Sequence, residues 1–152
     1  MYNINMKISR VLTNGLAAET GVLMRRMVDT YYQDMAPYAH LSLPDVFNLI
    51  KNLPFRNDPD DEETLMRPLY TMNMQGPGGD CDDKSIALAS YFKLAGVPWR
   101  FVAVRRPEKK DLHHVFTEYY NSISGRWTPA DPTYGFNVLG RERERYAERV
   151  II

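Results

Sequence analysis

The sequence predicts an α+β fold in which one buried central helix packs on a small antiparallel sheet. Residues 82–95 are apolar on almost every side of a helix, which indicates burial on most sides. Residues 100–106 and 114–120 are rich in β-branched and aromatic residues and flank a polar segment, a pattern typical of paired antiparallel strands. With 152 residues, 44% hydrophobic and 25% charged, the chain has the size and composition of one globular domain, predicted over residues 1–152.

Two helices are predicted in the N-terminal part, over about residues 16–51. From Leu16 to Met35 apolar residues recur at three- and four-residue steps, which predicts an amphipathic helix that ends before Pro37. Ser42 is the expected N-cap of a second helix over residues 44–51, since a proline is tolerated in the first turn of a helix.

The core of the domain, which also holds the candidate functional residues, is predicted over about residues 52–135. It opens with the acidic segment 57–63 (NDPDDEE), which we expect to be a solvated loop because it lacks the alternating ligands and the glycine of a calcium loop. The run GPGGD breaks the chain just before Cys81, and Gly96 is the expected C-cap of the central helix. A third strand is predicted over residues 126–130.

Residues 136–152 are predicted to form a charged C-terminal tail. The last twelve residues, RERERYAERVII, carry charges at nearly every position, which indicates a solvated terminal helix or tail.

The charge balance and the apolar runs exclude two classes of partner. Nineteen basic and nineteen acidic residues give a net charge of zero, so we expect neither nucleic acid nor a membrane as partner. The apolar runs are far shorter than the roughly 20 residues of a membrane span, and the N-terminal residues lack the apolar core of a signal peptide, so we expect a cytoplasmic protein. A single cysteine excludes an internal disulfide and indicates a reducing compartment.

Cys81 is the candidate nucleophile. A cysteine attacks an acyl carbon as thiolate, and the N-terminus of a helix favours that form while its N–H groups can also bind an oxyanion. Asp80, Asp82 and Asp83 surround the cysteine and would raise its pKa, so a cationic partner is needed. Asp80 and Asp83 also have an ordinary role as caps of the helix.

The chain offers three histidines as that partner. His40 lies among loop residues, whereas His113 and His114 begin a strand. Adjacent strand side chains point to opposite faces, so at most one of the two can face the cysteine, and the alternation leaves open which one. The same alternation argues against a zinc site, and no metal is expected. Asp131, after the third strand, could orient the imidazole or simply initiate a turn before Pro132.

Three stretches, GGDCDDKSIALASYFKLAGVPWRFVAV, HHVFTEYY and RWTPADPT, resemble the transglutaminase-like superfamily of papain-like cysteine enzymes. That family typically has G-D-C before a buried helix, a strand that opens with H-V, and a strand that closes on D-P. The resemblance covers residues 52–133 and implies a papain-like core with Cys81 as nucleophile, His114 as base and Asp131 as the residue that orients the histidine. It favours His114 over His113, because the family histidine directly precedes the valine.

The resemblance implies acyl transfer on protein or peptide amide bonds through a thioester, by proteolysis, deamidation or crosslinking, with no cofactor. Gln75 lies at the spacing of the oxyanion glutamine of papain-like enzymes, although it could equally be an ordinary loop amide. Trp127 and Tyr134 are candidate walls of the substrate cleft, or packing residues. Similarity to bacterial and phage members raises two alternatives: association with a virion, and an inactive module of the same fold with a binding or structural role. An unrelated α+β binding domain with a buried cysteine is a third.

Overall fold

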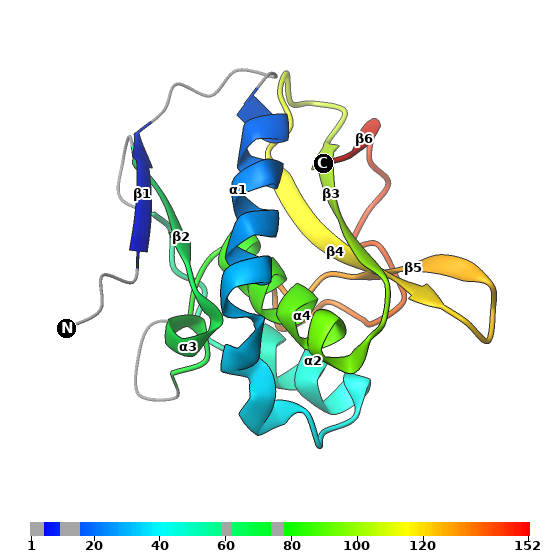
Figure 1. Cartoon of the computed structure of the whole chain (residues 1–152). Helices are drawn as coiled ribbons and strands as arrows, with labels where there is room; N and C mark the ends of the chain where they lie inside the picture. The colour runs from blue at the N-terminus through cyan, green and yellow to red at the C-terminus, as the bar shows by residue number, and fades with distance from the viewer. Residues whose placement is uncertain (1–4, 10–15, 59–61, 74–77) are drawn as a thin grey trace.

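The computed structural model describes residues 5–9, 16–58, 62–73 and 78–152. Along the chain the elements are β1 (Asn5–Ser9), α1 (Leu16–Tyr31), the 3-10 helix η1 (Tyr32–Tyr38), α2 (Leu43–Lys51), β2 (Glu62–Met66), α3 (Pro68–Thr71), α4 (Cys81–Ala95), β3 (Trp99–Arg105), β4 (His114–Asn121), β5 (Arg126–Ala130) and β6 (Glu148–Ile151) (Figure 1).

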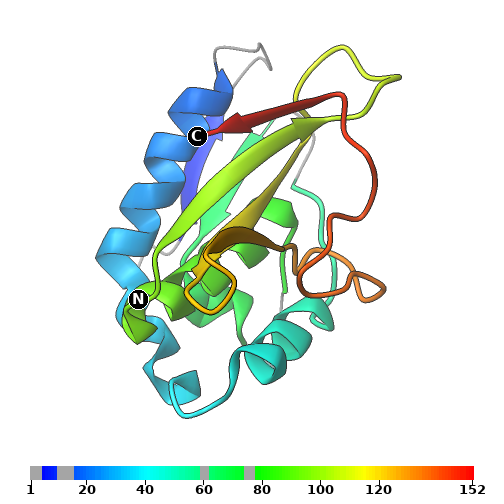
Figure 2. The same cartoon turned by 90° about the vertical axis from the view of Figure 1, so that its right-hand side faces the viewer.

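The predicted α+β fold is confirmed, with a four-stranded antiparallel sheet in the order β5-β4-β3-β6. The three strands predicted from sequence form at the expected residues. The fourth, β6, lies along the outer edge of β3, pairing Val102 with Ile151 (Figure 2). The prediction of a solvated terminal helix or tail is therefore wrong for this segment. The charges that suggested solvation protect an edge strand, where charged side chains discourage further pairing.

The two middle strands, β3 and β4, bury side chains on both faces of the sheet, since neighbouring residues on a strand point to opposite sides. On the α4 side lies the central cluster, a group of buried residues from α1, β2, α4, β3 and β4: Met24, Met27, Val28, Leu65, Ile86, Ala89, Phe101 and Val115. On the opposite side Val102, Val104 and Phe116 pack against Tyr146 of the C-terminal segment. Helix α4 is thus buried between the sheet and the N-terminal helices, as its composition predicts.

The N-terminal helices follow the expected pattern with one difference. The α-helical part ends at Tyr31 and continues as η1, which includes Pro37, so the proline lies inside a 3-10 turn rather than after the helix. Ser42 caps α2, and its Oγ accepts a hydrogen bond from the Asp45 N–H at 3.3 Å. No helix in the described part of the chain combines the length and the apolar character needed to cross a membrane.

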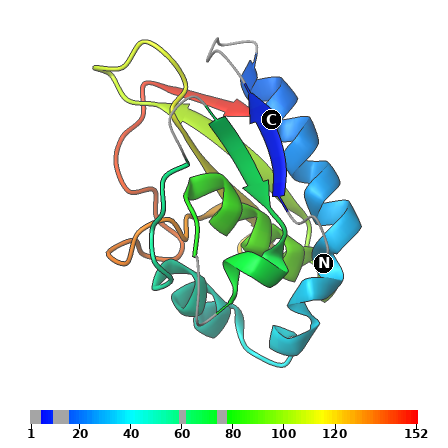
Figure 3. The ribbon, with the colours of Figure 1, turned by 90° about the vertical axis from the view of Figure 1, so that its left-hand side faces the viewer.

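Two further strands, β1 and β2, form a separate antiparallel pair in which Asn5 lies opposite Met66 and Ser9 opposite Glu62. Figure 3 shows the two strands side by side next to α1. The prediction of a loop over residues 57–63 is therefore partly wrong, since β2 begins at Glu62. The residues that pair lie more than fifty positions apart in the sequence, so no local pattern announces the pairing.

Candidate functional site

Cys81 is the first residue of α4, as the sequence predicts, and it is half-buried against the central cluster. The glycines before it allow a very close turn. A Cβ on Gly79 would lie 2.5 Å from the Cβ of Asp83, and a Cβ on Gly78, whose φ is 60°, would lie 2.1 Å from the carbonyl oxygen of Pro54. Only glycine fits these two positions, so Gly78 and Gly79 fix the path by which the chain enters the helix.

The loop that precedes Cys81 is held by backbone hydrogen bonds to the segment after α2. The Gly79 N–H donates to Pro54 O and the Arg56 N–H donates to Gly79 O, both at 3.1 Å. Phe55 and Gly79 form an isolated parallel bridge. The ring of Phe55 is therefore fixed close to the start of the central helix.

His114 and Asp131 meet in the structure. The Nε2 atom of His114 lies 2.8 Å from Oδ2 of Asp131, and the two side chains are 9% and 2% exposed. Asp131 is held further by the Thr133 N–H, which donates to its Oδ1 at 3.1 Å, and by the Asn137 amide, which donates to its backbone oxygen at 3.1 Å. Burial would raise the pKa of Asp131, but the bonds from His114 and Thr133 bring it below its ordinary value.

The neighbouring histidine is placed differently. The side chain of His113 is exposed, and burial of part of the ring together with the nearby Arg106 lowers its pKa. His114, not His113, is the histidine that contacts the aspartate. His40 lies exposed after η1, far from these residues in the sequence.

Two hydrogen bonds fix the first turns of α4 against the start of β4. Ser85, one turn after the cysteine, donates from its Oγ to Val115 O at 3.4 Å, and Thr117 donates from its Oγ1 to Ser85 O at 3.1 Å. Val115 follows His114 and belongs to the central cluster on which Cys81 packs. The fold thus brings the start of the cysteine helix and the start of the histidine strand to one region.

Lys84, which sequence analysis missed, connects α4 to the end of α2 and to the segment after β5. Its Nζ donates to the backbone oxygens of Leu53 at 2.7 Å, Thr133 at 2.9 Å and Lys51 at 3.3 Å, and the residue is 1% exposed. Burial lowers the pKa of Lys84 to about 8, against the opposite influence of Asp131. A signal for it existed, because a helix buried on most sides leaves its only early lysine little exposed surface.

Aromatic rings surround His114. The ring of Tyr134, predicted as a cleft residue, lies 6.4 Å from the imidazole and stacks 5.2 Å from Phe55 and 5.3 Å from Phe136. We call Phe55, Tyr134 and Phe136 the aromatic stack. Through Phe55 and Tyr134 it connects the loop before the cysteine to the residues beside the histidine.

Tyr146 is a second residue that sequence analysis missed, because it lies in the segment predicted as a tail. Its ring is 6.4 Å from that of His114 and 6.3 Å from that of Phe116. Burial, and then the negative charge of Asp131, raises the pKa of Tyr146. The C-terminal segment therefore covers the imidazole from the outer face of the sheet.

Of the predicted cleft residues, Trp127 is not brought to this region. Trp127 lies opposite Tyr120 on β4, six residues beyond His114, which places it roughly 20 Å along the strand. There its ring contacts Tyr120 at 5.7 Å and the guanidinium of Arg100 at 4.3 Å. Gln75 lies outside the described residues.

The acidic residues near the cysteine form a compact group. Burial and the neighbouring Asp80 raise the pKa of Asp82 and of Asp83 well above the usual value. Asp58, Asp80 and Asp83 each place a carboxylate oxygen within 4.8 Å of the others, a spacing that could hold a metal ion. Asp83 also accepts hydrogen bonds from the N–H groups of Met66 at 2.8 Å and Asp80 at 3.4 Å, consistent with the predicted helix cap.

Comparison with known proteins gives one family match. The family model described as Transglutaminase-like superfamily matches residues 37–132, more than half of the chain. No curated protein and no solved structure matches the chain. The matched region runs from the end of η1 to the residue after Asp131 and so includes α2, α4 and the strands β3 to β5. The chain belongs to the transglutaminase-like superfamily.

Proposed function

We propose that the protein is a thiol-dependent acyl-transfer enzyme that acts on amide bonds of proteins or peptides, with Cys81 as nucleophile, His114 as base and Asp131 as the residue that orients it. The observation that carries the proposal is the buried contact between Nε2 of His114 and Asp131. An ionised carboxylate only accepts hydrogen bonds, so Nε2 carries the proton and Nδ1 is left as the basic nitrogen.

The chemistry follows from this tautomer. Nδ1 of His114 takes the proton from the thiol of Cys81, and the thiolate attacks the amide carbonyl to give a tetrahedral oxyanion, which N–H groups at the start of α4 can bind. The C–N bond then breaks, and the leaving amine receives the proton from the imidazolium. Water or a second amine attacks the resulting thioester, with His114 again taking and returning a proton, and the product is a carboxylic acid or a new amide.

The raised pKa values of Asp82 and Asp83 support a reactive thiolate. Three charged carboxylates next to the sulfur would oppose its ionisation. Burial favours the neutral form of two of them, so they carry less negative charge than exposed aspartates would. The N-terminus of α4 acts in the same direction, because the N–H groups of the first turn and the helix dipole favour a negative charge.

The pH dependence of cysteine alkylation tests the proposal. Because Cys81 is the single cysteine of the chain, iodoacetamide labelling reports on it alone. We expect an apparent pKa below about 7.5 in the wild type and a value near 8.5 in His114→Ala. His113→Ala is the matched control and should leave the profile unchanged, since its side chain is exposed and His114 makes the contact with Asp131.

An inactive module of the same fold gives a different result. Its cysteine would alkylate with the profile of an ordinary thiol in all three proteins. That outcome would leave the family assignment intact and remove the proposed activity.

A further inference from the structure

The exposed end of the aromatic stack carries a positive charge. The guanidinium of Arg143 lies 4.7 Å from the centre of the Tyr134 ring and 4.9 Å from that of Phe136. Phe136 is 64% exposed, so the surface formed by the ring and the guanidinium is open to solvent. Contact with two rings holds the guanidinium in place, and its N–H groups that point away from the rings are available as donors.

Arg143 has no carboxylate partner among the described residues, and what distinguishes it is its position over two aromatic rings. The two glutamates that flank it in the sequence are both engaged: Glu142 binds Arg149 at 2.6 Å, and Glu144 binds Arg106. A positively charged group held flat on aromatic rings, with the adjacent acids bound elsewhere, is suited to bind a carboxylate that comes from another molecule.

The position of this surface connects it to the proposed reaction. Tyr134, under the guanidinium, is the ring that lies 6.4 Å from His114. Phe55, at the other end of the stack, pairs through its backbone with Gly79, two residues before Cys81. A peptide whose reacting amide lies between Cys81 and His114 would therefore pass close to the aromatic stack.

We propose that Arg143 and the aromatic stack bind an acidic side chain of the substrate, so that the preferred substrates are peptides with a glutamate or aspartate near the amide that is attacked. This proposal rests on the proposed function for the choice of amide. One ring separates Arg143 from His114, and an extended chain advances about 3.3–3.6 Å per residue. The acidic residue should therefore lie within about three residues of the reacting one.

Binding to a protein that cannot react tests this proposal apart from the activity. The protein is Cys81→Ser, and the probes are acetylated, amidated heptapeptides with a central glutamine, one phenylalanine next to it, and a single glutamate moved through the other positions. A second set carries glutamine in place of the glutamate. With dye-labelled peptides, we expect fluorescence anisotropy to show at least about fivefold tighter binding of the glutamate peptide at one or more positions near the centre.

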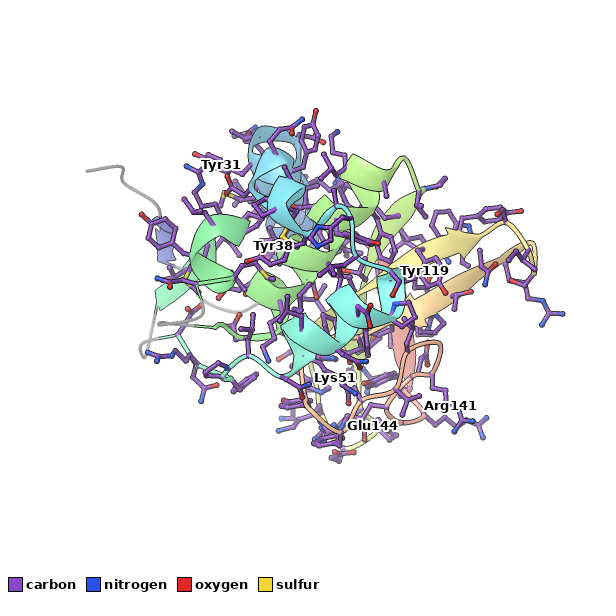
Figure 4. The ribbon with its side chains drawn as sticks, turned by 90° about the horizontal axis from the view of Figure 1, so that it is seen from below. Tyr31, Tyr38, Lys51, Tyr119, Arg141 and Glu144 are labelled. Carbon is purple, nitrogen blue, oxygen red and sulfur yellow. The ribbon has the colours of Figure 1, made fainter. Side chains whose placement is uncertain are left out.

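Substitutions identify the group responsible. Arg143→Gln should reduce the preference for glutamate to less than about twofold, and Arg143→Lys should retain part of it, since it keeps the charge but not the planar donors. Arg141→Gln is the matched control, an exposed arginine on the same segment (Figure 4), and should keep the full preference. Phe136→Ala, which removes one supporting ring, should weaken the preference without removing it.

The outcomes that overturn the proposal are distinct. Equal affinity for glutamate and glutamine peptides at every position would refute it, and so would a preference that survives in Arg143→Gln. A third probe, the glutamine peptide with a free C-terminal carboxylate in place of the amide, tests the chain end: if only this peptide binds more tightly, the proposed acidic side chain is refuted. Incubation of the same peptides with the wild type, read by mass spectrometry, tests the reaction separately. If the glutamate peptides bind more tightly but the wild type forms no product from any peptide, the proposed function is refuted and the proposed binding site for an acidic side chain stands.

Discussion

Replacing Lys84 with methionine should remove the donor that three backbone oxygens share inside the protein. Each hydrogen bond to a charged group contributes about 1.5–3 kcal/mol, and each buried acceptor left without a donor costs about 1–3 kcal/mol. The bond to Lys51 O is long at 3.3 Å, and the substitution also relieves the burial of an ammonium group. We therefore expect a net loss of about 3–5 kcal/mol in the free energy of unfolding, a large part of the 5–15 kcal/mol typical of a domain.

Urea unfolding at pH 7, followed by the fluorescence of the two tryptophans, measures this loss. Lys93→Met on the same helix is the matched control. The ammonium of Lys93 lies 2.8 Å from Asp29, whose side chain is 62% exposed, and such a surface pair contributes less than about 1 kcal/mol. If Lys84→Met loses no more than Lys93→Met does, the three contacts of Lys84 do not hold the loops together and the reasoning is wrong.

Three further predictions concern the same region. The stability advantage of the wild type over Lys84→Met should grow between pH 8 and about 10. Burial lowers the pKa of Lys84 to about 8 in the folded protein, so in this range the folded protein has already lost a proton that the unfolded chain still binds. Urea titrations at pH 7.5 and 9.5 measure the change. Asp131→Asn should lower the free energy of unfolding by about 1–3 kcal/mol at pH 7. The difference from wild type should shrink as the pH falls below about 4, since the pKa of Asp131 is lowered on folding. A difference that stays constant with pH would contradict this. Tyr146→Ala should lower the free energy of unfolding by about 1–3 kcal/mol through the loss of ring contacts, as measured by thermal unfolding. Tyr146→Phe keeps the ring and should be nearly as stable as the wild type. If it is as unstable as Tyr146→Ala, the effect belongs to the hydroxyl.

Sequence analysis succeeded where a local pattern and the tertiary environment agree. The central helix follows from its nearly continuous apolar character and from Gly96, which adopts φ 71° at the C-cap. The strand over residues 126–130 follows from the turn residues on either side of it. Side-chain alternation could not choose between His113 and His114, and the resemblance to the family supplied that choice; in the structure the contact of His114 with Asp131 agrees with it.

The missed strands and the missed Tyr146 share one physical cause, which is pairing between segments far apart in the chain. The charges at nearly every C-terminal position indicated a solvated helix or tail. The four residues of β6 are indeed exposed, but they form an edge strand that gains its stability from backbone bonds to β3. For the same reason Tyr146 was not identified as a site residue. Its contact with His114 depends on how the C-terminal segment passes over the sheet. The segment also contacts α2, where the Nζ of Lys51 donates to Asn137 O at 3.1 Å.

The pairing of β6 with β3 has a consequence for biosynthesis. The ribosome delivers the chain from its N-terminus, so Trp99–Arg105 emerges more than forty residues before Glu148–Ile151. Until that last strand arrives, one side of β3 presents unpaired N–H and C=O groups, and Ile152 is missing from its place against Gly21. We expect the nascent chain to be most prone to aggregation, and most dependent on chaperones, in this interval.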